Sequence, residues 1–120
     1  MPPLLATHAS ARLGQDFSSV SVHEDGSPER LGTSAYARGD ALYFASGQYR
    51  PHTAEGVAKI GHELGHVVQQ RGGRVQPTGV RGNVPVNTDP ALEREADASG
   101  TAVAQGLDIH ALFGFGAHRG

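Results

Sequence analysis

Cysteine is absent from this 120-residue chain. Its absence excludes a disulfide framework and any thiolate-bound metal, so histidine and carboxylates are the good zinc ligands that remain. No apolar run approaches the roughly 18 residues that a membrane span needs, and we expect none. The net charge of −2 and isoelectric point near 6.4 give no basic stripe, so nucleic acid is not an expected partner.

Hydrophobic residues are also scarce, at 38% of the chain, whereas glycine is abundant, at 17 residues. The length predicts one domain over residues 1–120, with its core at about 11–105 and a C-terminal tail at 107–120. A bound metal would help to stabilise so small a core. Residues 1–8 lack a basic region and a sufficient apolar region, so we expect no Sec signal peptide.

Glycine and proline divide the chain into short elements. Some elements have the two-residue period of a strand and others the 3.6-residue period of a helix, so we predict an α+β domain. A short antiparallel sheet or hairpin should pack on two helices. The expected elements are an arm or short helix over 1–12, a strand around Val20 and Val22, a helical turn or two over 29–34, a hairpin of strands 35–37 and 41–45 turning at Gly39, a helix over 53–70, an irregular loop over 71–87 with a short strand at 84–86, and a second helix over about 90–105.

Residues 62–66 read His-Glu-x-x-His within the helix predicted over 53–70. Residues four apart share one face of a helix, so His62 and His66 could together bind one zinc ion. Glu63 could then reach a zinc-bound water, whose pKa falls to about 7, and take its proton. The motif predicts a zinc-dependent hydrolase, most often a peptidase. A chance match is the alternative, because the chain has seven histidines.

The same helix has a second pattern, which sets how it packs. Thr53 is a plausible N-cap, and Gly72 with Gly73 should end the helix. Gly61 and Gly65 leave one flank bare, so that another backbone could approach closely. An apolar arc on the side away from the motif should face the core, and it consists of Val57, Ile60, Leu64, Val67 and Val68.

The second predicted helix offers a third ligand. Glu93 and Asp97 are four apart and share a face with the small residues Ala96 and Gly100, which could approach the first helix closely. We predict Glu93 as the third zinc ligand and Asp97 as the acceptor of a hydrogen bond from a ligating histidine. Glu95 should point elsewhere. The alternative is a solvated acidic face, because acids suit the start of a helix.

The whole arrangement, His-Glu-x-x-His followed on a later helix by Glu-x-x-x-Asp, resembles the gluzincin metallopeptidases. The chain is also similar to the eCIS core domain, a metallopeptidase-like domain associated with extracellular contractile injection systems. That likeness covers about residues 11–105, is most specific over 62–70, and is carried by residues 13–20, 35–44, 47–49, 62–70 and 93–97. It implies one zinc ion per chain on His62, His66 and Glu93, with Glu63 as general base. Gly65 stands where the family often has Thr, off the zinc face.

The first functional hypothesis is therefore a zinc metalloendopeptidase that acts on a peptide or protein substrate. Glu63 would deprotonate the zinc-bound water and pass the proton to the leaving amine. Strand 41–45 could offer its edge to an extended peptide. An oxyanion partner is also needed, and the sequence does not choose among His110, Tyr49, Tyr43 and the loop arginines.

The resemblance also implies a rival hypothesis, a zinc-stabilised structural or docking module that loads onto an injection system. A third hypothesis is an enzyme inhibited by its own tail, in which residues 107–120 cover the cleft and His110 or His118 adds a ligand. The family's domains occur in bacterial proteins, often fused to toxins or other cargo. We therefore expect synthesis in the bacterial cytoplasm and, if the protein leaves the cell, a route other than Sec.

Overall fold

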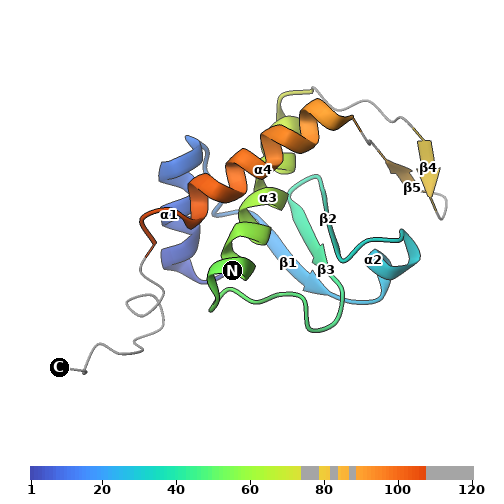
Figure 1. Cartoon of the computed structure of the whole chain (residues 1–120), viewed down its shortest axis with the longest axis horizontal. Helices are drawn as coiled ribbons and strands as arrows, with labels where there is room; N and C mark the ends of the chain where they lie inside the picture. The colour runs from blue at the N-terminus through green and yellow to red at the C-terminus, as the bar shows by residue number, and fades with distance from the viewer. Residues whose placement is uncertain (74–78, 82–83, 87–88, 108–120) are drawn as a thin grey trace.

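The computed structural model describes residues 1–73, 79–81, 84–86 and 89–107, of which 79–81 and 84–86 are described in their backbone only. The predicted α+β class is confirmed, with helices packed around a small sheet (Figure 1). Its elements are α1 (Pro3–Leu13), β1 (Ser21–Glu24), α2 (Ser27–Arg30), β2 (Ala35–Arg38), β3 (Ala41–Phe44), α3 (Ala54–Arg71), β4 (Gly79–Arg81), β5 (Val84–Val86) and α4 (Pro90–Ala104).

The first sheet has the strand order β1-β3-β2. The predicted hairpin is confirmed, since β2 and β3 pair antiparallel and Gly39 takes a positive φ of 60° in the turn. The sheet as a whole is mixed, because β1 pairs with β3 in parallel, Ser21 opposite Ala41. The hairpin reverses the chain at the far edge, so β3 returns beside β1 in the same direction.

This strand order changes which strand offers an edge. We predicted that strand 41–45 could bind an extended peptide, but β3 pairs with neighbours on both sides and has no open edge. The prediction was wrong because strand order depends on non-local pairing, which the local sequence does not encode. Strand β2 is an outer strand of the sheet instead.

For the N-terminal elements, the structure selects one of two expected alternatives and shifts one boundary. Residues 3–13 form the helix α1, which decides between an arm and a helix. The helical turn predicted over 29–34 lies earlier, at Ser27–Arg30. The carboxylate of Asp25 accepts a hydrogen bond from the Ser27 backbone N–H at 2.9 Å, and Pro28 fits a first helical turn. The helical conformation therefore starts before Glu29.

Helix α3 passes through the middle of the domain, and its predicted apolar arc is confirmed. Val57, Ile60, Leu64 and Val67 are fully buried, and Val68 packs against them while partly exposed. The arc contacts the core face of the sheet, α1 and the loop after it, where the buried partners are Leu42, Phe44, Leu5, Ala9 and Phe17. Burial of this apolar surface fixes the rotation of α3 and so the direction of its polar face.

The bare flank of α3 packs directly on α4, as predicted. A Cβ atom on Gly61 would lie 2.9 Å from the Cα of Gly100, and one on Gly65 would lie 3.0 Å from the Cα of Ala96. A Cβ on Gly100 would collide with the carbonyl oxygen of Ala58. Only residues as small as glycine and alanine allow this approach, which brings the acidic start of α4 beside the motif.

Both ends of α3 are tied down. Thr53 caps its start as predicted, since its hydroxyl accepts from the Gly56 N–H at 2.9 Å, and the helix ends at Gly72. Gln70 joins the helix to the hairpin: its amide nitrogen donates to the Ala37 carbonyl at 2.9 Å, and its amide oxygen accepts from the Gly39 N–H at 2.7 Å. These contacts hold β2 beside the helix that carries the motif.

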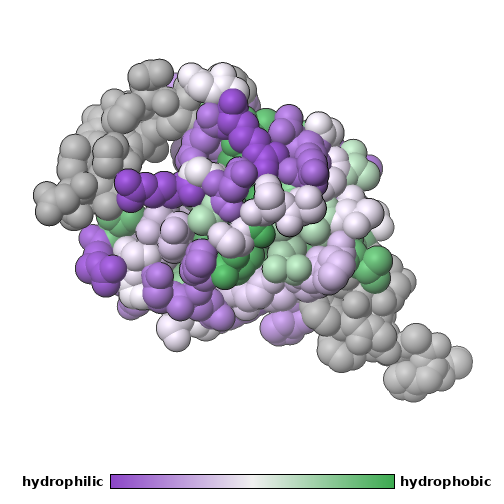
Figure 2. Space-filling model, turned by 180° about the vertical axis from the view of Figure 1, so that it is seen from behind, coloured by the Kyte–Doolittle hydropathy of each residue, from purple (hydrophilic) through white to green (hydrophobic). Residues whose placement is uncertain are grey.

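The segment between the long helices is only partly described. The strand predicted at 84–86 is confirmed as β5, which pairs with β4, while the rest of the loop and residues 108–120 of the tail lie outside the described residues. Figure 2 shows the face behind that of Figure 1, where hydrophilic residues alternate with small apolar patches. Within the described ranges, no helix has the length and apolar character to cross a membrane.

Candidate metal centre

The three predicted ligands converge on one point between α3 and α4. The Nε2 atoms of His62 and His66 are 3.2 Å apart. The Glu93 carboxylate lies across from both, with 3.3 Å between its Oε1 and His62 Nε2 and 3.0 Å between its Oε2 and His66 Nε2. His62, His66 and Glu93 thus form a group that could hold a metal ion.

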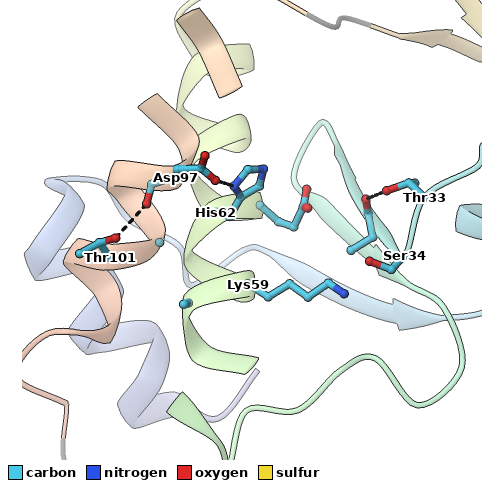
Figure 3. A pocket seen from close by; sticks show the side chains of 10 residues that line it. Thr33, Ser34, Lys59, His62, Asp97 and Thr101 are labelled. Carbon is cyan, nitrogen blue, oxygen red and sulfur yellow. Dashed lines mark hydrogen bonds and ion pairs between the residues drawn. The ribbon is translucent and has the colours of Figure 1, made fainter. Parts of the chain in front are cut away.

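The ring nitrogen of His62 that points away from Glu93 faces Asp97, the predicted hydrogen-bond acceptor of a ligating histidine. His62 Nδ1 lies 2.8 Å from Asp97 Oδ1, one turn after Glu93 on α4 (Figure 3). An ionised carboxylate only accepts hydrogen bonds, so the ring proton sits on Nδ1 and donates to Asp97. The Nε2 atom that faces Glu93 therefore carries a lone pair.

Sequence reasoning missed the corresponding partner of His66, which is Gln69. His66 Nδ1 lies 2.9 Å from Gln69 Oε1, while Gln69 Nε2 donates to the Leu92 carbonyl at 2.8 Å and faces Glu95 Oε1 at 3.3 Å. Two acceptors at the amide nitrogen fix the orientation of the amide, so Nδ1 of His66 donates to Oε1. The signal was present, because Gln69 follows His66 by three residues on the same helix.

The hydrogen bonds outside the group explain why it suits a cation. With one proton on each ring, both Nε2 atoms present lone pairs to each other and to the Glu93 carboxylate. The acceptor atoms then lie 3.0–3.3 Å apart, an arrangement that is repulsive while both rings are neutral. A positive ion at the centre would satisfy all three, so the donor set and its geometry fit a bound metal.

Glu63 lies beside this group in an unusual state for a carboxylate. Only 6% of the residue is exposed, and its Oε1 has no hydrogen-bond partner among the described residues. Burial raises the pKa of the Glu63 carboxyl above its usual range, and nearby His66 and His62 offset part of that rise. A buried carboxylate oxygen without a partner is costly unless it serves a ligand or a reaction.

A pocket of about 560 Å³ opens next to the metal group. It lies between α3, α4 and the residues leading into β2, and His62 and Glu63 form part of its wall (Figure 3). Thr33, Ser34 and Lys59 line the part of it that is away from α4. The pocket therefore connects the candidate metal group with the outer strand of the sheet.

The structure does not bring the tyrosines suggested as oxyanion partners to this pocket. Leu42 and Phe44 face the core, so Tyr43 points to the opposite face of the sheet, where its ring stacks on Tyr36 at 4.8 Å. Tyr49 packs on Phe44 at 5.4 Å, and burial, with the charge of Glu24, raises its pKa. Neither tyrosine lines the pocket. His110 lies outside the described residues.

The comparison with known proteins supports the family resemblance over the His-Glu-x-x-His motif. The matched stretch is shorter than the resemblance over residues 11–105 expected from the sequence. A family model described as the eCIS core domain matches residues 1–74. The match covers His62, Glu63, His66 and Gln69, and it ends before α4, so Glu93 enters the site by geometry alone. No curated protein and no solved structure matches the chain.

Proposed function

Because this chain belongs to the eCIS core domain family, we propose that it is a zinc-dependent metalloendopeptidase associated with an extracellular contractile injection system. The observation that carries the proposal is the buried Glu63 carboxylate, whose Oε1 has no hydrogen-bond partner among the described residues, beside three converging ligand residues. A purely structural metal site has no use for such a carboxylate. A hydrolytic site needs a base close to the metal.

Zinc suits the donor set better than the other common metals. Two imidazole nitrogens and one carboxylate are the ligand types of catalytic zinc sites, which leave one position open. Bonds of about 2.0–2.2 Å in a tetrahedron place ligand atoms about 3.3–3.6 Å apart, somewhat more than the 3.0–3.3 Å between these atoms. A bound zinc ion supplies Lewis acidity and lowers the pKa of a water molecule to about 7.

Residues of the chain would transfer the proton and orient the metal ligands. Glu63 takes a proton from the attacking water and returns it to the leaving amine, and its raised pKa makes it a stronger base than an exposed carboxylate. Asp97 and Gln69 fix the tautomer and the orientation of the two histidine rings.

Strand β2 would align an extended peptide beside the pocket. The Ala45 N–H donates to the Ser34 carbonyl at 2.9 Å, so the next pair, Ala35 and Phe44, is one that exchanges no hydrogen bonds. The backbone of Ala35 therefore faces outward, where its carbonyl oxygen accepts from the Thr33 hydroxyl at 3.0 Å, and the residue lines the pocket. A substrate strand would add to the sheet there, on β2 instead of β3.

The experiment that tests this function compares zinc binding with cleavage of a casein-type substrate. Glu63→Gln should bind stoichiometric zinc like the parent but cleave about 10²–10⁴-fold more slowly, because the base is lost. Glu55→Gln, an exposed acid in the first turn of α3, is the matched control and should keep full activity. Equal rates for parent and Glu63→Gln would show that Glu63 is not the base.

A zinc-stabilised docking module is the second candidate function. It is favoured by the pocket lining, in which the described residues include no tyrosine, and by the metal group itself, which would crosslink α3 to α4. Stoichiometric zinc without any turnover, in the full chain and in a chain lacking residues 107–120, would support this candidate. Activity only after removal of the tail would support self-inhibition.

A further inference from the structure

The pocket beside the metal group contains a cation that the proposed reaction does not use. Lys59 is the sole lysine of the chain, and it lies one turn before Glu63 on α3. Its side chain is partly buried and extends across the pocket toward the segment of Thr33 and Ser34 (Figure 3). The cation therefore faces the same space as the motif.

Lys59 forms no ion pair in the part of the chain that the structure describes, although Glu63, one turn along α3, is near enough for the two charges to attract. Its Nζ donates to the neutral amide oxygen of Gln48 at 3.1 Å, and none of the ion pairs between described residues involves it. An ammonium group has three hydrogens to donate, so two remain for another acceptor. A partly desolvated cation with unused donors is suited to bind an anion.

The charges around the pocket also favour one position for such an anion. Glu63 and Asp97 line the pocket toward the metal group, and Glu93 lies behind them. Near Lys59, in contrast, the pocket is lined by the uncharged residues Thr33 and Ser34, and the Thr33 hydroxyl donates to the Ala35 carbonyl at 3.0 Å. Together Glu63, Glu93 and Asp97 carry three negative charges, more than the two positive charges of a bound zinc ion. An anionic group would therefore be drawn to Lys59, one turn along the same helix, instead of to the side of the metal group.

We propose that Lys59 makes this pocket a specificity site for a carboxylate on the substrate, next to the peptide bond that is cleaved. The inference rests on the proposed peptidase function and adds the substrate class. The carboxylate would come from an Asp or Glu side chain or from the free C-terminus of a peptide. Both sources present the same group to the ammonium, so separate peptides must distinguish them.

The test uses the full chain with zinc and two measurements. Equilibrium binding to the Glu63→Gln protein compares labelled peptides that differ only by Glu against Gln, each with a free or an amidated C-terminus. Cleavage by the parent protein is followed on the same peptides. We expect the carboxylate peptide to bind about tenfold more tightly, the size of one charge-assisted hydrogen bond.

Substitution of the lysine then assigns the effect. Lys59→Met should remove the tenfold preference, and Lys59→Glu should reverse it toward a peptide with lysine at that position. Arg94→Met, which removes an exposed cation of α4 outside the pocket, is the matched control and should keep the preference.

Two results would overturn the inference. One is equal affinity of the Glu63→Gln protein, with Lys59 intact, for the Glu and Gln peptides. The other is a Lys59→Met variant that slows cleavage of both peptides by the same factor at unchanged KM, since Lys59 would then act on the reaction and not on the substrate carboxylate. If zinc binds and carboxylate peptides bind selectively but none is cleaved, the peptidase function fails while the carboxylate site stands.

Discussion

Gln69 is the side chain that ties the candidate metal centre to the packing of the helices. Its amide oxygen receives the proton of His66 Nδ1, and its amide nitrogen holds the first turn of α4 through the Leu92 carbonyl. It is 2% exposed, so water does not replace either contact. One residue thus orients a ligand on α3 and positions the helix that supplies the third ligand.

Two substitutions separate these roles of Gln69. Gln69→Leu removes the acceptor for His66 and should weaken zinc binding about 10–100-fold. Gln69→Glu keeps an acceptor at that place but loses the donor to Leu92, so it should keep most zinc affinity while lowering stability. Zinc titration against a chelator, together with urea unfolding, measures both. Equal losses of affinity in the two variants would mean that Gln69 acts only through helix packing.

The elements meet where side chains are smallest. Helices α3 and α4 approach at Gly61, Gly65, Ala96 and Gly100, and each glycine there lacks room for a Cβ atom. Glycine inside a helix costs about 1 kcal/mol relative to alanine, so these positions weaken both helices when taken alone. The cost is offset by a close approach that sets Glu93 opposite His62 and His66.

Enlarging this contact should therefore damage both fold and site. A Cβ on Gly61 would lie 2.8 Å from that of Val103 and 2.9 Å from the Cα of Gly100, so Gly61→Val must push the helices apart. We expect a loss of about 1–3 kcal/mol in unfolding free energy and weaker zinc binding. Ala98→Val, at an exposed site of α4, tests the helix-propensity cost alone. Similar losses in both variants would contradict the packing argument.

The whole molecule places its polar site at the junction of its layers. Helix α3 turns its apolar arc to the sheet and α1, its bare flank to α4, and its motif to the space left between α4 and β2. Glu63 is buried there because β2 is held against α3 by Gln70. The domain therefore carries a carboxylate that opposes folding when no metal is bound.

The pH dependence of global stability follows from this carboxylate. A raised pKa means that the folded state holds the proton more tightly than the unfolded state, so stability falls as pH rises above the ordinary value of 4.5. In the metal-free protein, Glu63→Gln should raise the unfolding free energy at pH 7 by about 1–3 kcal/mol. Parent and variant should converge below pH 4.5 in urea unfolding. A gap that is constant with pH would contradict this account.

Sequence alone determined the features that depend on neighbours along the chain. The spacing of His62 and His66, the cap at Thr53, the apolar arc, the bare flank of α3 and the hairpin at Gly39 all follow from periods of 3.6 and 2 residues or from local turn chemistry. Residues 93–97 were recognisable for the same reason, because a spacing of four puts Glu93 and Asp97 on one face.

Tertiary structure decided the features that depend on residues distant in the chain. The parallel pairing of β1 with β3, the outer position of β2, the removal of Tyr43 and Tyr49 from the pocket, and the place of Lys59 in its wall all arise from non-local packing. A local pattern fixes which face of an element is polar. What that face meets is settled only when the buried faces have packed and left the remaining surfaces beside one another.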